Sequence, residues 1–337
     1  MPPIRTHTVQ IVDELHFTGG LRGRRQGSGW LIGPLRVDGA FVEMGPVPET
    51  HISIVAAELR VRAFGADETL LGDPHLPTRI WRPFVGLEAT SGLPTELWGN
   101  IAHHAAAAAD EDYSALARYV SVCLRASDIR LRDISDGYGA QLLSALTNGA
   151  EVGHPFENIP LADLHLAIHS FVAEMGAARD YLAAIVGRQL GAPTSKDSLA
   201  RLIDWLGADA RRTAASQPAA VALTRGWADA EDPWLKQLTD YRNLFLHRGP
   251  MGARGFESAP RLAASATRHG EVRTLVLPIP RRLEGPDTVD ALTQFVRLHW
   301  QMFQLAADLA AVASYASTPI VITSADIVDE PQPPSLR

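Results

Sequence analysis

The stretch DYRNLFLHRGP, residues 240–250, predicts a helix that ends abruptly. Three apolar residues at i, i+3 and i+4 spacing give this helix a buried side: Tyr241, Leu244 and Phe245. The pair Gly249 and Pro250 cannot continue a helix, so we expect the helix to end just before it. Its last two turns carry three side chains that can contact a phosphate or transfer a proton: Arg242, Asn243 and His247.

The spacing of these polar residues decides which of them can reach the same ligand from a straight helix. Asn243 and His247 are four residues apart and therefore share one face of a helix. Arg242 precedes His247 by five residues, which is roughly 140° around the axis of a straight helix. From a straight helix, these two side chains cannot converge on one small ligand. Either the last turn is distorted at Gly249, or a second copy of the protein completes the site.

Long segments with helical periodicity lie on both sides of this stretch. We expect four helices, which span residues 161–190, a segment that begins near residue 195, about 232–247 and about 286–313. Breakers at Gly191 and Pro193 end the first of them. Helices in this order predict an up-and-down four-helix bundle with the motif on its third helix.

Residues 1–155 differ from this region, because they are rich in strand-like segments. Strands are expected over residues 8–12, 30–32, 35–37, 51–64 and 78–87, and helices over 94–117 and 141–147. The segments 114–124 and 129–134 fit a helix and a strand equally well. The glycine- and arginine-rich segment 19–27 matches no phosphate-binding fingerprint, and we predict a solvated hairpin loop there.

A run of breakers without periodicity, residues 152–160, marks the expected boundary between two domains. The sequence therefore predicts an α+β fold with three parts. These are a mixed α/β domain over residues 1–155 for recognition or regulation, the helical bundle over 156–318, and a short strand with a disordered tail over 319–337. A chain of 337 residues is long enough for two domains with separate cores.

The composition limits the class of function. The net charge of −7 and the isoelectric point near 5.9 argue against binding nucleic acid over a broad surface, but they allow a small basic site for RNA. The one cysteine, Cys123, excludes an internal disulfide and predicts a reducing cytoplasm. No apolar run is long enough to span a membrane. Arginine far outnumbers lysine among the 31 basic residues, which, with the alanine content, suggests a high-GC bacterial source.

The motif and its context resemble the HEPN superfamily, in which the third helix of a four-helix bundle ends in an arginine followed after a few residues by a histidine. The matching residues are Arg242, Asn243 and His247, and the resemblance covers roughly residues 161–313. It implies a metal-independent endoribonuclease without a cofactor, often a toxin or an antiviral defence effector, that acts as a homodimer with a composite cleft. The implied partners are RNA and an antitoxin or regulatory protein, with no membrane involved.

The resemblance also implies a role for each residue. RNA cleavage needs a base for the 2′-hydroxyl, an acid for the leaving oxygen and a cation beside the phosphorane. His247 is the candidate for proton transfer, and Arg242 offers a planar fork of donors to phosphate oxygens. Asn243 is expected to orient His247 or the phosphate. Tyr241 and Arg248 are candidates for binding the RNA strand.

Two other interpretations fit the sequence. The bundle can be a non-catalytic dimerisation or nucleotide-sensing module, in which Arg242 and His247 only cap the helix and form ordinary ion pairs. A metal-dependent enzyme is the weaker alternative. It would use His165 and His169, which share one face of a predicted helix, together with His299 on the apolar stripe of the last helix. We favour the simpler interpretation that His165 and His169 lie at the edge of the core.

Overall fold

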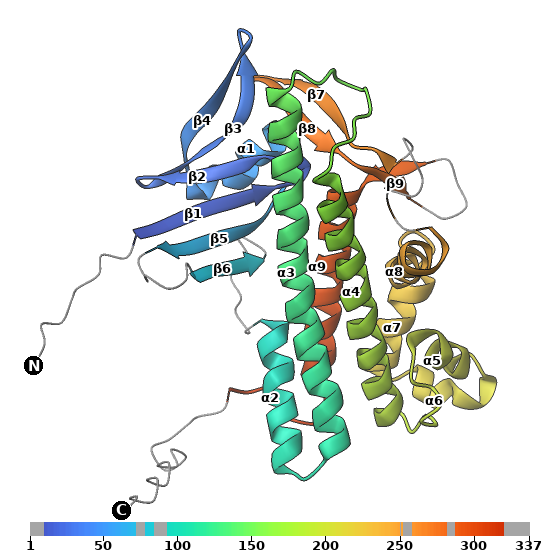
Figure 1. The fold of residues 1–337 in the computed structure, drawn as a ribbon. Helices are drawn as coiled ribbons and strands as arrows, with labels where there is room; N and C mark the ends of the chain where they lie inside the picture. Colours follow the sequence, from blue (N-terminus) through green and yellow to red (C-terminus); the bar gives the residue numbers. More distant parts are fainter. Residues whose placement is uncertain are drawn as a thin grey trace, which may run out of the picture.

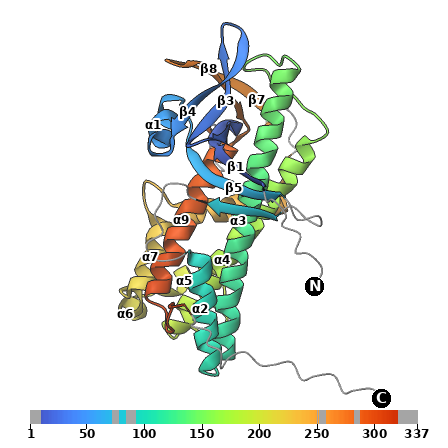
Figure 2. The same cartoon turned by 90° about the vertical axis from the view of Figure 1, so that its left-hand side faces the viewer.

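The computed structural model describes residues 10–71, 78–83, 93–249, 251, 258–281 and 287–319. Within these residues the chain combines an antiparallel β-sheet with long helices, which confirms the α+β class. The sheet lies beside the upper half of the longest helix, and the helices continue below it (Figures 1 and 2). No helix in these ranges is long and apolar enough to cross a membrane.

The sheet contains strands from both ends of the chain. Its members are β1 (Gln10–Phe17), β2 (Arg22–Gln26), β3 (Gly29–Val37), β4 (Ala40–Pro48), β5 (Ala63–Leu71), β6 (Thr78–Pro83), β7 (Arg261–Thr267) and β8 (Gly270–Val276). The order is β6-β5-β1-β2-β3-β8-β7, and β4 also pairs with β3. A two-stranded sheet joins β9 (Pro278–Pro280) to β10 (Thr288–Asp290). The main sheet therefore crosses the domain boundary expected near residue 155, and that boundary stays a prediction.

Most of the helices, in contrast, come from the middle of the chain. They are α1 (Ile52–Glu58), α2 (Pro94–Ala107), α3 (Glu111–Thr147), α4 (Leu161–Gln189), α5 (Leu199–Leu206), α6 (Arg212–Ala215), α7 (Pro218–Ala228), α8 (Trp234–Asn243) and α9 (Ala291–Ala311). Short helical turns are η1 (Thr18–Gly20), η2 (Glu49–His51), η3 (Asp209–Arg211) and the π-helix η4 (Leu244–Arg248).

The longest helix, α3, has 37 residues and links the sheet to the other helices. Asp110 caps its first turn by accepting a hydrogen bond from the backbone N–H of Tyr113. Gly149, with φ of +68°, follows its end. α3 contains the two segments that fitted a helix and a strand equally well. It contacts α2, α4 and α9 and also β6 and β8 of the sheet.

Residues 51–64, predicted as one strand, instead form the end of η2, a helix, a turn and the start of β5. α1 buries Ile52 and Ala56, and Leu59 follows at helical spacing and is also buried. Arg60 has φ of +60°, the left-handed conformation of a turn. The prediction was wrong because the polar–apolar alternation that suggested a strand falls on this turn.

The segment 19–27, predicted as a solvated loop, forms part of η1, the strand β2 and a tight turn. Gly19 and Gly20 have φ of 75° and 86°, which glycine adopts without strain. Arg22 then pairs with His16 of β1 in the sheet. The prediction was wrong because the glycines make a tight turn, and the arginines that follow are strand residues.

The helices around the motif lie close to the ranges predicted from the sequence. α4 spans the segment expected at 161–190, α8 and η4 together span most of 232–247, and α9 spans most of 286–313. The helix expected near residue 195 is the short α5. The strand expected after residue 319 and the tail lie outside the described residues.

Tyr138 of α3 is fully buried and joins α3 to the start of α9. Its hydroxyl donates to Asp290 Oδ1 at 2.8 Å and accepts from the backbone N–H of Leu292 at 3.0 Å. Tyr138→Phe removes this partner from both groups, so we expect the free energy of unfolding to fall by about 2 kcal/mol. Urea unfolding measures the loss, with Tyr119→Phe, an exposed position on the same helix, as the matched control. Equal stability of the two variants would contradict the prediction.

Candidate functional site

The motif lies where α8 ends and a π-turn begins. α8 ends at Asn243, and the next five residues form η4. The N–H of Gly249 donates to the carbonyl of Leu244 at 2.9 Å, which is an i→i+5 bond. A π-helix turns through a smaller angle per residue than an α-helix, so the angular offset between Arg242 and His247 is smaller than in a straight α-helix. A distorted last turn, one of the two predicted alternatives, is therefore present.

Aromatic contacts hold this helix end in place. Tyr241 is only 2% exposed, and its hydroxyl donates to the carbonyl of Pro280 at 2.8 Å. Its ring stacks on Phe245 with centroids 5.7 Å apart, and Phe245 in turn stacks on His169 of α4. The structure thus places Tyr241, one of the residues expected to bind RNA, in the core, where it positions the motif.

Arg242 is half-buried against α4. Its aliphatic chain passes over Gly176, where an added Cβ would lie 2.6 Å from Arg242 Cδ. Within the described residues, Arg242 has no hydrogen bond or ion pair. The neighbouring Arg179 differs, because Asp180 accepts from its Nη2 at 2.8 Å and Thr239 also accepts from it. Burial, and then the charge of Arg242, lower the pKa of Arg179. The positive charge of Arg242 is therefore not neutralised by an acid in the described part of the chain.

The other polar residues of the motif are more accessible. Asn243 is half-buried, whereas His247 and Arg248 are exposed at the end of η4. In the ranges that the structure covers, none of these three side chains forms a hydrogen bond or an ion pair. The helix end therefore presents the imidazole of His247 and the guanidinium of Arg248 to solvent, within six residues of Arg242 in the chain.

The three histidines of the metal alternative do not form one site. His169 Nε2 accepts from the backbone N–H of Met251 at 3.1 Å. His165 is buried, and burial lowers the pKa of both His165 and His169. His299 of α9 is fully buried elsewhere, with its Nε2 2.6 Å from Asp128 Oδ1 of α3. The His165 and His169 pair therefore lacks His299 as a third ligand.

A charged cluster that the sequence did not reveal lies between the sheet and α3. Glu14 and His16 lie on the same face of β1, and Asp67 is the residue of β5 directly opposite Glu14. Ligand atoms of these three side chains lie within 4.8 Å of one another, the one metal-capable group found among the described residues. A Glu-x-His spacing was the available sequence signal, but the third member depends on the register of β1 with β5.

Two arginines and a carboxylate of α3 extend this cluster. Arg22 of β2 donates to Asp136 Oδ1 at 3.2 Å. Arg79 of β6 donates to Asp67 and, at 2.6 Å, to Asp136 Oδ2. Burial lowers the pKa of His16 to about 4, so its imidazole is neutral at neutral pH.

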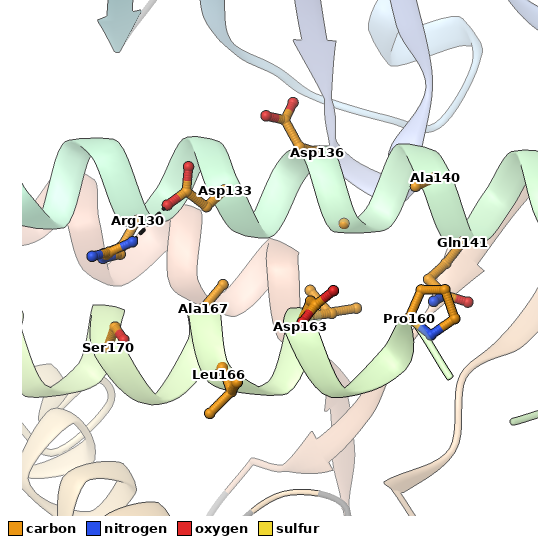
Figure 3. A pocket seen from close by; sticks show the side chains of 12 residues that line it. Arg130, Asp133, Asp136, Ala140, Gln141, Pro160, Asp163, Leu166, Ala167 and Ser170 are labelled. Carbon is orange, nitrogen blue, oxygen red and sulfur yellow. Dashed lines mark hydrogen bonds and ion pairs between the residues drawn. The ribbon is translucent and has the colours of Figure 1, made fainter. Parts of the chain in front are cut away.

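A groove between α3 and α4 has a volume of about 430 Å³ (Figure 3). Its lining includes Asp133, Asp136, Gly137, Asp163, Leu164 and Leu166. Arg130 is the one basic residue of this lining, and it pairs with Asp133 at 2.9 Å. Acidic side chains outnumber basic ones here, so the groove disfavours the phosphates of RNA. The end of η4 is the better candidate for an anion.

No known protein family, curated protein or solved structure matches this chain. Its function therefore has to be inferred from the site itself. The site combines Arg242, a cation without an acidic partner among the residues that the structure covers, with an exposed histidine and a π-turn, a distortion that is frequent at functional sites. Arginine forks fit phosphate oxygens well.

Proposed function

We propose that this protein is a metal-independent endoribonuclease of HEPN type that cleaves RNA through Arg242 and His247. The observation that carries the proposal is the half-buried Arg242, which has no acidic partner in the described part of the chain. Because its aliphatic chain is already fixed against α4, its guanidinium loses little freedom when it binds an anion. The imidazole of His247, one distorted turn away, is exposed and available for proton transfer.

The packing of the helices supports a HEPN-like bundle. α3 contacts α4 and α9, α4 contacts α8 and α9, and α8 contacts α9. These four helices form one packed group with the motif at the end of its third member in chain order. In this proposal the bundle starts with α3, so it includes residues that precede the boundary expected near residue 155.

The proposed chemistry assigns one task to each side chain. The 2′-oxygen attacks phosphorus and the 5′-oxygen leaves, which gives a cyclic phosphate and a free 5′-hydroxyl. A neutral His247 imidazole accepts the proton of the 2′-hydroxyl as the base. A protonated His247 imidazolium donates a proton to the leaving 5′-oxygen as the acid. Arg242 donates to the non-bridging oxygens as charge develops on them. Asn243 orients the phosphate, and Arg248 binds the adjoining strand.

A homodimer follows from this chemistry. The attacking and leaving oxygens lie on opposite sides of phosphorus, so two imidazoles serve the two proton transfers better than one. Each chain has one motif histidine, and we propose that His247 of a second copy completes the cleft. The sheet region then serves recognition or regulation, through an antitoxin or another regulatory protein.

The test is incubation of the full-length protein with total RNA, with and without EDTA. We expect cleavage that resists EDTA and is lost in an Arg242→Ala/His247→Ala variant. His154→Ala is the matched control, because His154 is 71% exposed and lies far from the motif in the sequence. Mapping of the ends is expected to show cyclic phosphates.

Three results would contradict the proposal. Cleavage that EDTA abolishes indicates a metal-dependent enzyme, and cleavage that persists in the double variant indicates another site. A folded wild-type protein that binds RNA or a nucleotide without cleaving it favours the non-catalytic interaction module.

A further inference from the structure

Two carboxylates face each other across the strands β1 and β5. Glu14 is the register partner of Asp67, and His16 lies two residues along β1 on the same face. Asp67 is 2% exposed, whereas Glu14 is 41% exposed. Like charges at directly opposed positions destabilise a pair of strands. A cation between the two carboxylates removes this repulsion.

Within the ranges that the structure describes, two buried polar atoms of this cluster have no hydrogen-bond partner of standard geometry: His16 Nε2 and Asp67 Oδ1. His16 is fully buried, and its Nε2 lies 2.8 Å from Asp67 Oδ2 and 3.8 Å from Glu14 Oε2. The shorter contact makes Asp67 Oδ2 an ion-pair partner of His16 Nε2, whereas Oδ1 of the same carboxylate has no partner among the described residues. Native proteins rarely leave a buried carboxylate oxygen unpaired, so Asp67 Oδ1 has room for a further ligand.

The second nitrogen of His16 is already occupied. Its Nδ1 lies 3.0 Å from Ser135 Oγ, and the same hydroxyl oxygen accepts from Arg22 Nη1 at 2.8 Å. When Nδ1–H donates to Ser135, the lone pair of the imidazole is on Nε2, which lies beside the two carboxylates. Metal-ligating histidines hold their second nitrogen in this way.

We propose that Glu14, His16 and Asp67 bind one divalent transition-metal ion, for which Zn²⁺ and Mn²⁺ are the best matches. Both ions accept an imidazole nitrogen together with carboxylate oxygens. Ligand atoms about 2.1 Å from an ion lie roughly 3–3.5 Å apart, and small side-chain rotations bring these three groups to that spacing. The ion joins β1 to β5, and water fills its remaining positions.

The neighbouring arginines are compatible with such an ion. The carboxylates of Glu14, Asp67 and Asp136 exceed the two guanidinium groups of the cluster by one negative charge. Asp136 accepts from Arg22 at 3.2 Å and from Arg79 at 2.6 Å and 3.0 Å. Both arginines therefore keep an acidic partner when Glu14 and Asp67 turn toward an ion.

An aromatic cover excludes water from one side of the site. The ring of Trp81 in β6 lies 4.9 Å from that of His16, between centroids. Trp81 packs over Gly65 of β5, where any larger side chain would collide with the indole. Low polarity around a site strengthens the attraction between an ion and its carboxylates. Glu14, the exposed ligand, leaves a route of entry from solvent.

The test uses the full-length protein, stripped with EDTA and dialysed into metal-free buffer. It is titrated with Co²⁺, whose visible absorption reports the ligand set, and with Zn²⁺ by calorimetry. We expect one equivalent to bind and the thermal midpoint of unfolding to rise with Zn²⁺. Glu14→Gln is expected to weaken Zn²⁺ binding at least about tenfold. Glu68→Gln is the matched control, since Glu68 follows Asp67 on β5 but pairs with Arg82.

Two further variants make the result specific. Asp67→Asn removes a second ligand and is expected to weaken binding as Glu14→Gln does. His103→Ala/His104→Ala, which removes adjacent histidines of α2, is expected to bind as the wild type. Circular dichroism establishes that each variant is folded. Absence of stoichiometric binding to the wild type, equal affinity in Glu14→Gln, or loss of binding in the α2 variant would overturn the proposal. These readouts do not depend on RNA cleavage.

Discussion

Gly176→Ala is expected to lower the rate of the proposed RNA cleavage about a hundredfold in a protein that remains folded. A Cβ at this position of α4 would lie 2.6 Å from Cδ of Arg242, closer than side-chain carbons approach. The guanidinium of Arg242 therefore has to move, and a displacement of about 1 Å at a reacting site can lower a rate by about two orders of magnitude. Alanine has the higher helix propensity, which offsets part of the strain in α4.

Gly187→Ala is the matched control on the same helix. A Cβ there meets Leu202 Cδ1 at 3.5 Å, an ordinary van der Waals distance. Initial rates on one RNA substrate and urea unfolding are measured for both variants. A lower rate without a matching loss of stability in Gly176→Ala alone shows that the effect arises from the displaced Arg242 and not from a general change in α4. In an Arg242→Ala background, Gly176→Ala is expected to have no further effect, because the displaced group is gone. Equal rates for the two single glycine variants of the otherwise wild-type protein would show that the contact with Gly176 does not control the site.

The local signals in the sequence predicted the motif helix, but they left its distorted last turn as one of two alternatives. Tyr241 and Phe245 at helical spacing predicted α8, and Gly249 marked the end of η4. The π-turn depends on distant contacts, because Tyr241 bonds Pro280 and Phe245 stacks on His169. That Arg242 meets no acidic partner in the described part of the chain is likewise a property of the packed helices. A sequence shows which charges exist, but it does not show which of them become neighbours.

The pairing of the strands and the charged cluster could not be predicted from the sequence for the same reason. β8 joins β3 through the pairs Leu35–Val272 and Arg36–Glu271, which are more than half the chain apart. The cluster needs the register of β1 with β5, and a shift of one residue would turn Asp67 to the other face of the sheet. Long-range pairing of this kind leaves no periodic signal. The segments 114–124 and 129–134 of α3 fitted a helix and a strand equally well because their polar and apolar residues are mixed over short windows.

Asp128→Ala is expected to lower the free energy of unfolding by about 3 kcal/mol, because it breaks a buried pair between α3 and α9. Asp128 Oδ1 lies 2.6 Å from Nε2 of His299, and the His299 side chain is fully buried. Removal of one partner from a buried pair typically costs about 3–5 kcal/mol. Burial raises the pKa of Asp128, although the contact with His299 acts in the opposite direction. Desolvation therefore offsets part of the stabilisation, and we expect the lower end of this range.

Asp133→Ala is the matched control, since it makes the same substitution on the same helix. Asp133 pairs with Arg130 at 2.9 Å and with Arg132 at 3.2 Å near the surface, so its loss is expected to cost less than about 1 kcal/mol. The difference in unfolding free energy between the two variants, measured with urea, gives the contribution of the buried pair, because the change in helix propensity is common to them. A loss in Asp128→Ala no larger than in Asp133→Ala would show that the pair does not stabilise the fold. His299 would then return as a candidate functional group, whereas a large loss assigns it to the core.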